Sequence, residues 1–252
     1  MNRVELKFVK CYLVAMPIGD EFNDISLRAL DVLKNSDFIF CESLDHCMHL
    51  NDKFGLGFAY KKIIHLKDKQ AEQKPNFKLV EFLIKKKKDF VIISDSGIPC
   101  FVDPGKEIVD FILTRFINEV KFHPIGFSSV LDAILVLLAK HCSRGFFFDS
   151  ESTKNKGINL PLNIFRNKLN FSIKNNLPFI FFVNYKNLNS LFGLLEKVGY
   201  NNDVLLVTNL SKKDVVGRGP VYKVLLGDLK EVEKSLFLVK ADDDIVLALY
   251  KK

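Results

Sequence analysis

Three short loops in the sequence combine glycine, proline and oxygen-bearing side chains in a way that could hold a ligand. They cover residues 17–20, 94–99 and 126–129, and each follows a short apolar run. Glycine lets a ligand approach the main chain closely, and main-chain N–H and C=O groups can recognise amine and adenine edges. The second loop adds the carboxylate of Asp95, and an Asp-Pro-Gly turn follows at 103–105. Each loop alone is an ordinary connection between a strand and a helix, but together they predict a small-molecule pocket.

An alternating α/β fold would bring these loops together. Short β-branched and aromatic runs read as strands at 11–16, 38–41, 63–66, 90–94 and 120–125. Apolar residues recur at helical spacing at 26–34, 77–86, 106–116 and 129–140. This alternation predicts a mostly parallel sheet covered on both faces, and open parallel sheets bind ligands where their strands end.

The second half of the chain reads as a smaller α/β domain. A polar stretch at 150–157 suggests a boundary, which divides the chain into an N-terminal domain, 1–142, with the ligand loops, and a C-terminal domain, 143–252. Strands are expected at 179–183, 204–208, 221–225, 235–240 and 245–250, and helices at 161–174 and 188–198. Because several of these strands follow one another without a helix, the second sheet should be mixed, with antiparallel pairs towards the C-terminus.

Composition narrows the class of protein. The chain has 37 Lys and Arg against 30 Asp and Glu, a formal charge of +7, which favours an anionic partner such as RNA. The composition of an AT-rich genome explains the same charge equally well. The five cysteines form no CxxC pair, which indicates a reducing compartment and a cytoplasmic location. The longest apolar run, 133–139, is too short to span a bilayer, so we expect no membrane segment and no export.

Several other motifs carry weaker signals. The closely spaced glycines at 55 and 57 and at 217 and 219 do not follow a strand and open a helix, so they do not form a dinucleotide fingerprint. The lysine run 85–88 could contact phosphates or could be the solvated end of a helix. Five side chains at short spacing could ligate zinc, but the start of a helix explains them as well, and we predict no metal site. They are Cys41, Glu42, His46, Cys47 and His49.

Ordered motifs along nearly the whole chain resemble those of the tetrapyrrole methylase superfamily. The matching segments are 12–19, 24–30, 94–99, 103–105, 126–129 and 205–211. Within that superfamily they are most similar to the branch that methylates the 2′-hydroxyl of a cytidine in small-subunit ribosomal RNA. The resemblance implies a two-domain class III methyltransferase, a homodimer, with S-adenosylmethionine held between the domains.

Carried over position by position, the resemblance implies which residues bind the cofactor. The first domain would contribute six of them from its three loops, and the second domain would complete the adenine pocket with two valines. They are Pro17, Ser94, Asp95, Ile98, Ser128 and Ser129, with Val183 and Val224.

Two segments depart from the family pattern. Residues 42–46 read Glu-Ser-Leu-Asp-His where the family has Glu-Asp-Thr-Arg-His, and 183–187 lose a Glu, a His and an Arg. Three functions therefore stay open: an RNA 2′-O-methyltransferase, a small-molecule methylase of the tetrapyrrole type, and a member that binds cofactor without catalysis. Glu42, His46 and Asp103 are candidates for the group that takes the proton, and the sequence does not choose among them.

Overall fold

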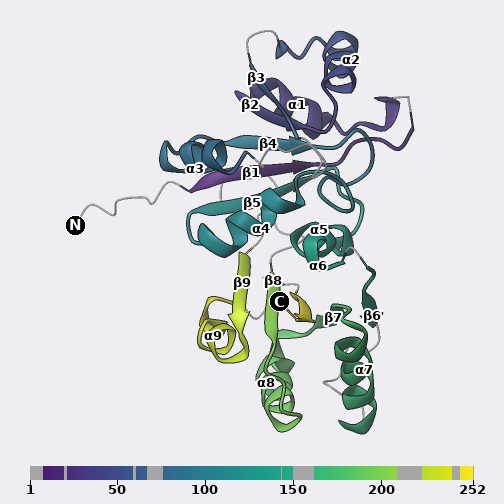
Figure 1. The fold of residues 1–252 in the computed structure, drawn as a ribbon, viewed down its shortest axis with the longest axis vertical. Helices are drawn as coiled ribbons and strands as arrows, with labels where there is room; N and C mark the ends of the chain where they lie inside the picture. Colours follow the sequence, from purple (N-terminus) through teal and green to yellow (C-terminus); the bar gives the residue numbers. More distant parts are fainter. Residues whose placement is uncertain are drawn as a thin grey trace, which may run out of the picture. The chain divides into compact units, whose positions relative to one another are not determined.

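The computed structural model describes residues 8–19, 22–58, 61–66, 76–142, 144–149, 162–208, 223–239 and 245–251. The chain divides into two compact units, residues 1–140 and 141–252, and each contains a five-stranded sheet (Figure 1). The polar stretch 150–157, from which the boundary after residue 142 was predicted, lies outside the described residues.

The sheet of the first unit is parallel throughout. Its strands are β1 (Val9–Val14), β2 (Phe38–Cys41), β3 (Lys62–His65), β4 (Phe90–Ile93) and β5 (Val120–Ile125), in the order β3-β2-β4-β1-β5. Every pairing between them is parallel. The predicted parallel α/β sheet is confirmed, because each of the five apolar runs forms a strand at or within two residues of its expected position.

The strand order decides which face each helix covers. The chain moves towards one edge of the sheet through α1 (Leu27–Asn35) and α2 (Leu44–Phe54), and back through α3 (Phe77–Lys85) and α4 (Lys106–Arg115). Since crossovers between parallel strands are right-handed, α1 and α2 lie on one face and α3 and α4 on the other. One core cluster indeed joins α1 and α2 to the sheet, while Phe77 of α3 stacks on Phe111 of α4 with ring centroids 4.6 Å apart. Three shorter elements complete this part of the chain: η1 (Phe22–Asp24), α5 (Val130–Leu137) and α6 (Ala139–Cys142).

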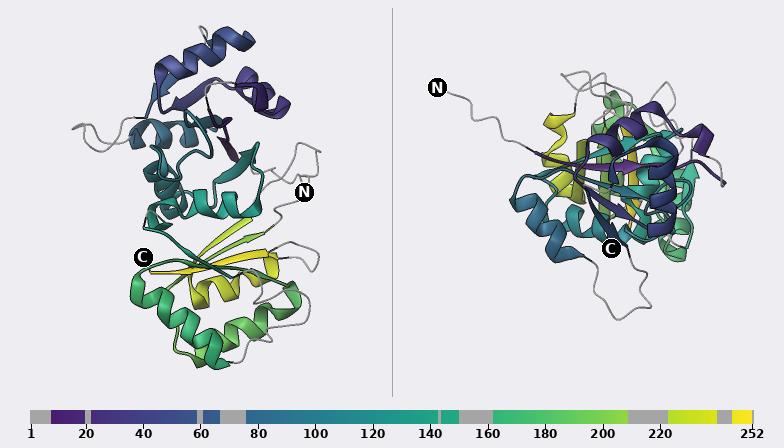
Figure 2. Two further views of the ribbon diagram at one scale, coloured as in Figure 1. Left: turned by 90° about the vertical axis from the view of Figure 1, so that its right-hand side faces the viewer. Right: turned by 90° about the horizontal axis from the view of Figure 1, so that it is seen from above.

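The sheet of the second unit is mixed, as predicted. Its strands run in the order β6-β7-β10-β8-β9, where β6 (Phe147–Asp149) pairs with β7 (Phe179–Val183) in parallel. The pairings of β8 (Asp203–Thr208), β9 (Lys223–Asp228) and β10 (Ile245–Tyr250) are antiparallel. One core cluster packs the helices against this sheet, and Figure 2 shows them on a single face. They are α7 (Leu162–Asn175), α8 (Leu188–Lys197) and α9 (Leu229–Lys234).

The strand predicted at 235–240 is wrong. Residues Leu236–Leu238 form a short 3₁₀ turn, η4, directly after α9, and another such turn, η3 (Tyr185–Asn187), precedes α8. The cause is α9, a helix that we did not predict, which starts with a capping box between Asp228 and Glu231. The Leu238 N–H then bonds to the Ser235 carbonyl, and Phe237 is left 81% exposed. A short apolar run does not by itself distinguish a strand from such a turn.

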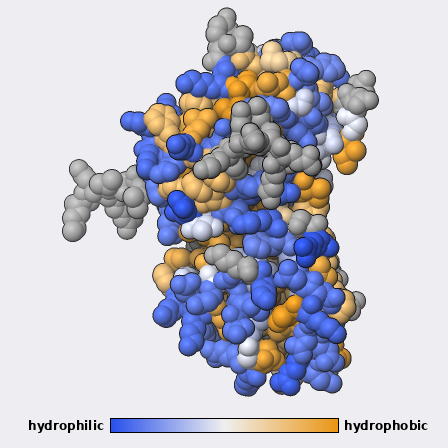
Figure 3. All heavy atoms as spheres, in the orientation of Figure 1, coloured by the Kyte–Doolittle hydropathy of each residue, from blue (hydrophilic) through white to orange (hydrophobic). Residues whose placement is uncertain are grey.

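The surface and the five thiols have the following features. No helix within the described ranges is both long and apolar enough to cross a membrane, and the face drawn in Figure 3 is mostly hydrophilic. All five cysteines are buried and unpaired. Burial raises the pKa of the Cys142 thiol to about 12 and raises that of Cys100 as well, so these thiols stay neutral and pack as small apolar groups.

Candidate functional site

The three loops of interest follow β1, β4 and β5, which are neighbours in the sheet. Because the strands are parallel, their carboxyl ends share one edge, and we call the segments 15–19, 42–43, 94–105 and 126–129 the carboxyl edge. After β1 the chain moves towards β2, whereas after β4 it moves towards β5, in the opposite direction. Adjacent strands β1 and β4 thus form a topological switch point, where open α/β sheets bind ligands.

Main-chain hydrogen bonds join the loops directly. Met16 donates to the Gly97 carbonyl at 2.8 Å, and Gly97 donates back to Met16 at 3.0 Å. The Ala15 N–H bonds to the carbonyl of Ile125 at 2.9 Å, which ties the ends of β1 and β5. Pro17 follows this junction and is buried, so it contributes shape to the junction rather than a polar contact.

The loop after β4 is shaped from within. Ser94 is 1% exposed, and its hydroxyl donates to the Ser96 carbonyl at 2.9 Å. Its side chain therefore builds the turn, while Ile98 is half-buried. Further along the same segment, Cys100 and Val102 have positive φ angles of 69° and 71°. Such conformations cost about 1–3 kcal/mol each and are found preferentially at functional sites.

The loop after β5 begins a helix. Ser129 is the N-cap of α5, where its hydroxyl accepts from the Leu131 N–H at 3.0 Å. The Asp132 carboxylate accepts from the N–H groups of Ser128 and Ser129 at 3.2 and 3.0 Å. Both serines remain exposed. The pattern Ser-x-x-Asp is the sequence signature of this capping box.

Carboxylates gather at the carboxyl edge. Glu42 Oε2 accepts from the Asp95 N–H at 3.0 Å, and Asp95 Oδ1 accepts from the Ser43 N–H at 3.1 Å. Partial burial, reinforced by the charges of Glu42 and Asp95 and opposed by Lys106, raises the pKa of Asp103 to about 6. The local charge is therefore negative. S-adenosylmethionine, which the resemblance implies, carries an ammonium and a sulfonium, so the charge of these residues fits that group.

The segment 41–49, whose side chains could ligate zinc, forms the end of β2 and the first part of α2. His46 lies on α2 with its ring edge-on to Phe22, centroids 5.0 Å apart. Its Nε2 is buried and has no hydrogen-bond partner among the described residues. Cys41 and Cys47 are both buried, and a side-chain hydrogen bond between them, together with burial, raises the pKa of the Cys47 thiol. Across the part of the chain that is described, no three His, Cys, Asp or Glu side chains are arranged to hold a metal.

The two valines expected from the second domain lie in its sheet. Val183 ends β7, pairs with Ile245 and is 5% exposed within the core. Val224 lies in β9 opposite Val207 and is half-buried. Both belong to the second unit, whereas the three loops belong to the first.

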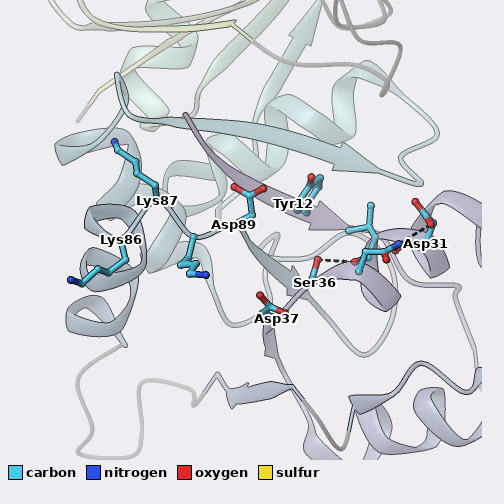
Figure 4. A pocket seen from close by; sticks show the side chains of 10 residues that line it. Tyr12, Asp31, Ser36, Asp37, Lys86, Lys87 and Asp89 are labelled. Carbon is cyan, nitrogen blue, oxygen red and sulfur yellow. Dashed lines mark hydrogen bonds between the residues drawn. The ribbon is translucent and has the colours of Figure 1, made fainter. Parts of the chain in front are cut away.

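A cavity of about 390 Å³ lies at the opposite edge of the first sheet and was not predicted (Figure 4). We call this the amino edge, because all of its residues except Tyr12 of β1 lie in the segments that lead into β2 and β4. Its charges are mixed: three lysines at the end of α3 and three aspartates line it together with four other residues. The lining residues are Tyr12, Asp31, Val32, Asn35, Ser36, Asp37, Lys86, Lys87, Lys88 and Asp89.

The comparisons with known proteins point to one family. Two relatives named ribosomal RNA small subunit methyltransferase I come from Leptospira biflexa serovar Patoc and Buchnera aphidicola subsp. Acyrthosiphon pisum. The first is 29% identical over 203 residues, 80% of this chain and 77% of that protein. The second is 26% identical over 247 residues, 96% of this chain and 79% of that protein.

Two solved structures align over most of the chain at low identity. The methyltransferase CobJ aligns with a TM-score of 0.36 and 11% identity, over 97% of this chain and all (100%) of that chain. Diphthine synthase aligns with a TM-score of 0.34 and 15% identity, over 97% of this chain and 90% of that chain. A family model described as tetrapyrrole (corrin/porphyrin) methylases matches residues 10–224. The chain therefore belongs to the tetrapyrrole methylase family, a family of methyltransferases.

Proposed function

We propose that this protein transfers a methyl group from S-adenosylmethionine to the 2′-hydroxyl of a cytidine in small-subunit ribosomal RNA. The observation that carries the proposal is the similarity to proteins named for methylation of small-subunit ribosomal RNA, which extends over 80–96% of the chain in the two relatives above. The charge of +7 agrees with a polyanionic substrate. A ribosomal substrate also implies a cytoplasmic location.

In this proposal the carboxyl edge holds the cofactor. The switch point between β1 and β4 supports this assignment, as do the glycine turns and the negative charge. Ser94 would act by shaping its turn, because its hydroxyl is already bonded to Ser96. The complete proposed set is Pro17, Ser94, Asp95, Ile98, Ser128 and Ser129, with Val183 and Val224 from the second unit.

When bound, the cofactor supplies a methyl group on a sulfonium, and the neutral thioether that remains after transfer is a good leaving group. The chain then has to orient the ribose hydroxyl in line with that methyl and take up its proton late in the reaction. Glu42 and Asp95 already accept main-chain N–H groups. Asp103, whose pKa is raised to about 6, is mostly ionised at neutral pH and lies at the same edge of the sheet, so we propose Asp103 as the acceptor.

The proposal includes a homodimer, which is the assembly that the family resemblance implies. A stable homodimer needs an interface that buries more than about 1,000 Å² in total. Light scattering at micromolar concentration should give twice the mass of 28.9 kDa calculated for one chain. A monomeric mass would refute this part of the proposal without affecting the assignment of the reaction.

The second candidate is a methylase of small molecules of the tetrapyrrole type. It is favoured by the description of the family model. A third candidate is a member that binds the cofactor but does not react, and the departures from the RNA branch at 43–45 and 183–187 favour it.

One assay separates the three candidates. Methyl-labelled S-adenosylmethionine is incubated with the protein and either small ribosomal subunits from a strain that lacks the enzyme or a tetrapyrrole acceptor. We expect label in the ribosomal RNA, with a rate that falls steeply from low to physiological salt because phosphate contacts release counterions. Label in the tetrapyrrole would support the second candidate, and cofactor binding without label in either acceptor would support the third.

A further inference from the structure

Glu42 lies where the ladder between β2 and β4 ends. The last residue pair of that ladder is Cys41 with Ile93. Beyond it the two chains separate, because Ser43 caps α2 while Ser94 begins the loop after β4. Main-chain pairing between the two strands stops at this point.

Two side chains continue the connection where the main chains diverge. Glu42 Oε2 accepts from the Asp95 N–H at 3.0 Å, and Asp95 Oδ1 accepts from the Ser43 N–H at 3.1 Å. The two bonds run in opposite directions between the same two loops. Both acceptors are carboxylates, and hydrogen bonds to charged groups are stronger than neutral ones. The pair therefore acts as one further step of the ladder, made by side chains.

The loop after β4 is thus held on two sides. Glu42 holds it from the β2 side, and the reciprocal bonds between Met16 and Gly97 hold it from the β1 side. The same segment contains Cys100 and Val102 in left-handed conformations, which persist only where the surrounding contacts determine them. Restraint from both sides meets that requirement.

We propose that Glu42 is a positioning residue for methyl transfer, whose side-chain oxygen holds the Asp95 main chain and so keeps the 94–98 loop in its cofactor-binding form. The inference rests on the proposed function only for the identity of the cofactor. Glu42 acts here through the loop and does not touch the reacting atoms. The hydrogen bond to its oxygen, rather than its charge, is what positions the loop.

The experiment compares four full-length proteins: the wild type, Glu42→Ala, Glu42→Gln and the control Glu119→Ala. Glutamine keeps an oxygen that can accept from the Asp95 N–H and removes the charge. Glu119 is a carboxylate of the same unit at the amino edge, where it pairs with Lys87 at 3.5 Å. Amide hydrogen exchange at 94–98 is measured without ligand, and binding of S-adenosylhomocysteine is measured by calorimetry.

The Glu42→Ala protein should exchange its 94–98 amides about tenfold faster and bind S-adenosylhomocysteine about tenfold more weakly, as loss of a hydrogen bond to a charged acceptor predicts. Glu42→Gln should stay within about threefold of the wild type in both measurements, and Glu119→Ala should match it. Rescue by Glu42→Gln, which keeps the oxygen that accepts from the Asp95 N–H, separates positioning of the 94–98 loop from a general loss of stability.

Wild-type exchange and binding in Glu42→Ala would overturn the proposal. So would a Glu42→Gln protein as defective as Glu42→Ala, because it would assign the effect to charge. If the wild type itself fails to bind S-adenosylhomocysteine at millimolar concentration, the proposed function is contradicted, and the exchange rates of the unliganded variants still support or overturn the role of Glu42.

Discussion

Strand β4 has an aspartate at each end, and the two have the same local role. Asp89, before the strand, accepts from the Lys10 N–H at 2.9 Å, and Asp95, after it, accepts from the Ser43 N–H at 3.1 Å. Their surroundings differ. Asp95 lies among turns, left-handed residues and two further carboxylates, whereas Asp89 lines a cavity beside three lysines. The comparison shows that the same kind of hydrogen bond, from a main-chain N–H to an aspartate, lies in different chemical surroundings at the two edges of the sheet.

Helix direction accounts for much of the difference between the edges. The helices of the first unit begin at the carboxyl edge, where Ser26 and Ser129 are N-caps, and their partial positive ends tolerate carboxylates. They end at the amino edge, with Lys34, Lys85 and Arg115 in their last turns. The lysine run 85–88 therefore complements a helix end, which is the simpler of its two interpretations.

The largest effect on stability should come from adding a methyl group at Gly105 in the carboxyl edge. Gly105 has a φ of 105°, and an added Cβ would lie 3.0 Å from Cys100 Sγ and 3.3 Å from Ile92 Cγ2. We expect Gly105→Ala to lower the free energy of unfolding by about 2–4 kcal/mol in urea denaturation. Gly55→Ala is the control, since it also has a positive φ but meets nothing within 4 Å. Gly55→Ala should lower the free energy of unfolding by ~1 kcal/mol, and equal losses in the two variants would contradict the packing argument.

The matched aspartates test the comparison itself. Asp95→Ala and Asp89→Ala each remove one acceptor of a main-chain N–H and should each lose roughly 1 kcal/mol of stability. Only Asp95→Ala should weaken binding of S-adenosylhomocysteine, by about 1–3 kcal/mol, because a charge-assisted contact is lost at the cofactor site. Calorimetry on both proteins measures this. Equal weakening in the two variants would mean that the edges do not differ in function.

A smaller effect is expected from the pH dependence of stability. The folded protein raises the pKa of Asp103 to about 6, mainly by burial, above the ~3.9 of an unperturbed aspartate. The folded state therefore binds the proton more tightly, and stability falls as pH rises from about 4 to 6. Asp103→Asn should flatten this slope in thermal unfolding. At pH values above 6 it should raise the midpoint temperature of unfolding by on the order of 1–3 °C, a small effect because the group is partly exposed and screened. An unchanged slope would count against the raised pKa.

The smallest effect should come from the amino-edge lysines. The double variant Lys86→Ala with Lys88→Ala removes two of the three lysines that line the cavity. Binding of S-adenosylhomocysteine should stay within about twofold of the wild type, and stability within about 0.5 kcal/mol, as for most surface substitutions. A large loss of binding would instead assign the cofactor site to the amino edge.

The strands and loops of the first unit could be predicted because their signals are local. The apolar runs at 38–41 and 120–125 coincide with β2 and β5, and the Gly, Pro and Asp of the turns stand beside them in sequence. The order of the strands depends on pairing between distant segments, and no local pattern contains it. The bond between Glu42 and Asp95, 53 residues apart, becomes visible only once β2 and β4 are known to be neighbours.

The second unit was harder to predict for a different reason. Leu236 to Leu238 are apolar and predict a strand, yet the capping box at Asp228 starts a helix, and these residues follow it in a 3₁₀ turn. Apolar content alone did not separate these outcomes. The roles of Val183 and Val224 in an adenine pocket remain predictions from the resemblance.

The central claim, that the carboxyl edge holds the cofactor, is tested most directly by photo-crosslinking. The protein is irradiated with methyl-labelled S-adenosylmethionine, digested, and the labelled peptides are identified by mass spectrometry. The account predicts label within 15–19, 94–98 and 126–129, reduced by competition with S-adenosylhomocysteine. Competed label confined to 31–37 and 86–89 would contradict it and assign the cofactor to the amino edge.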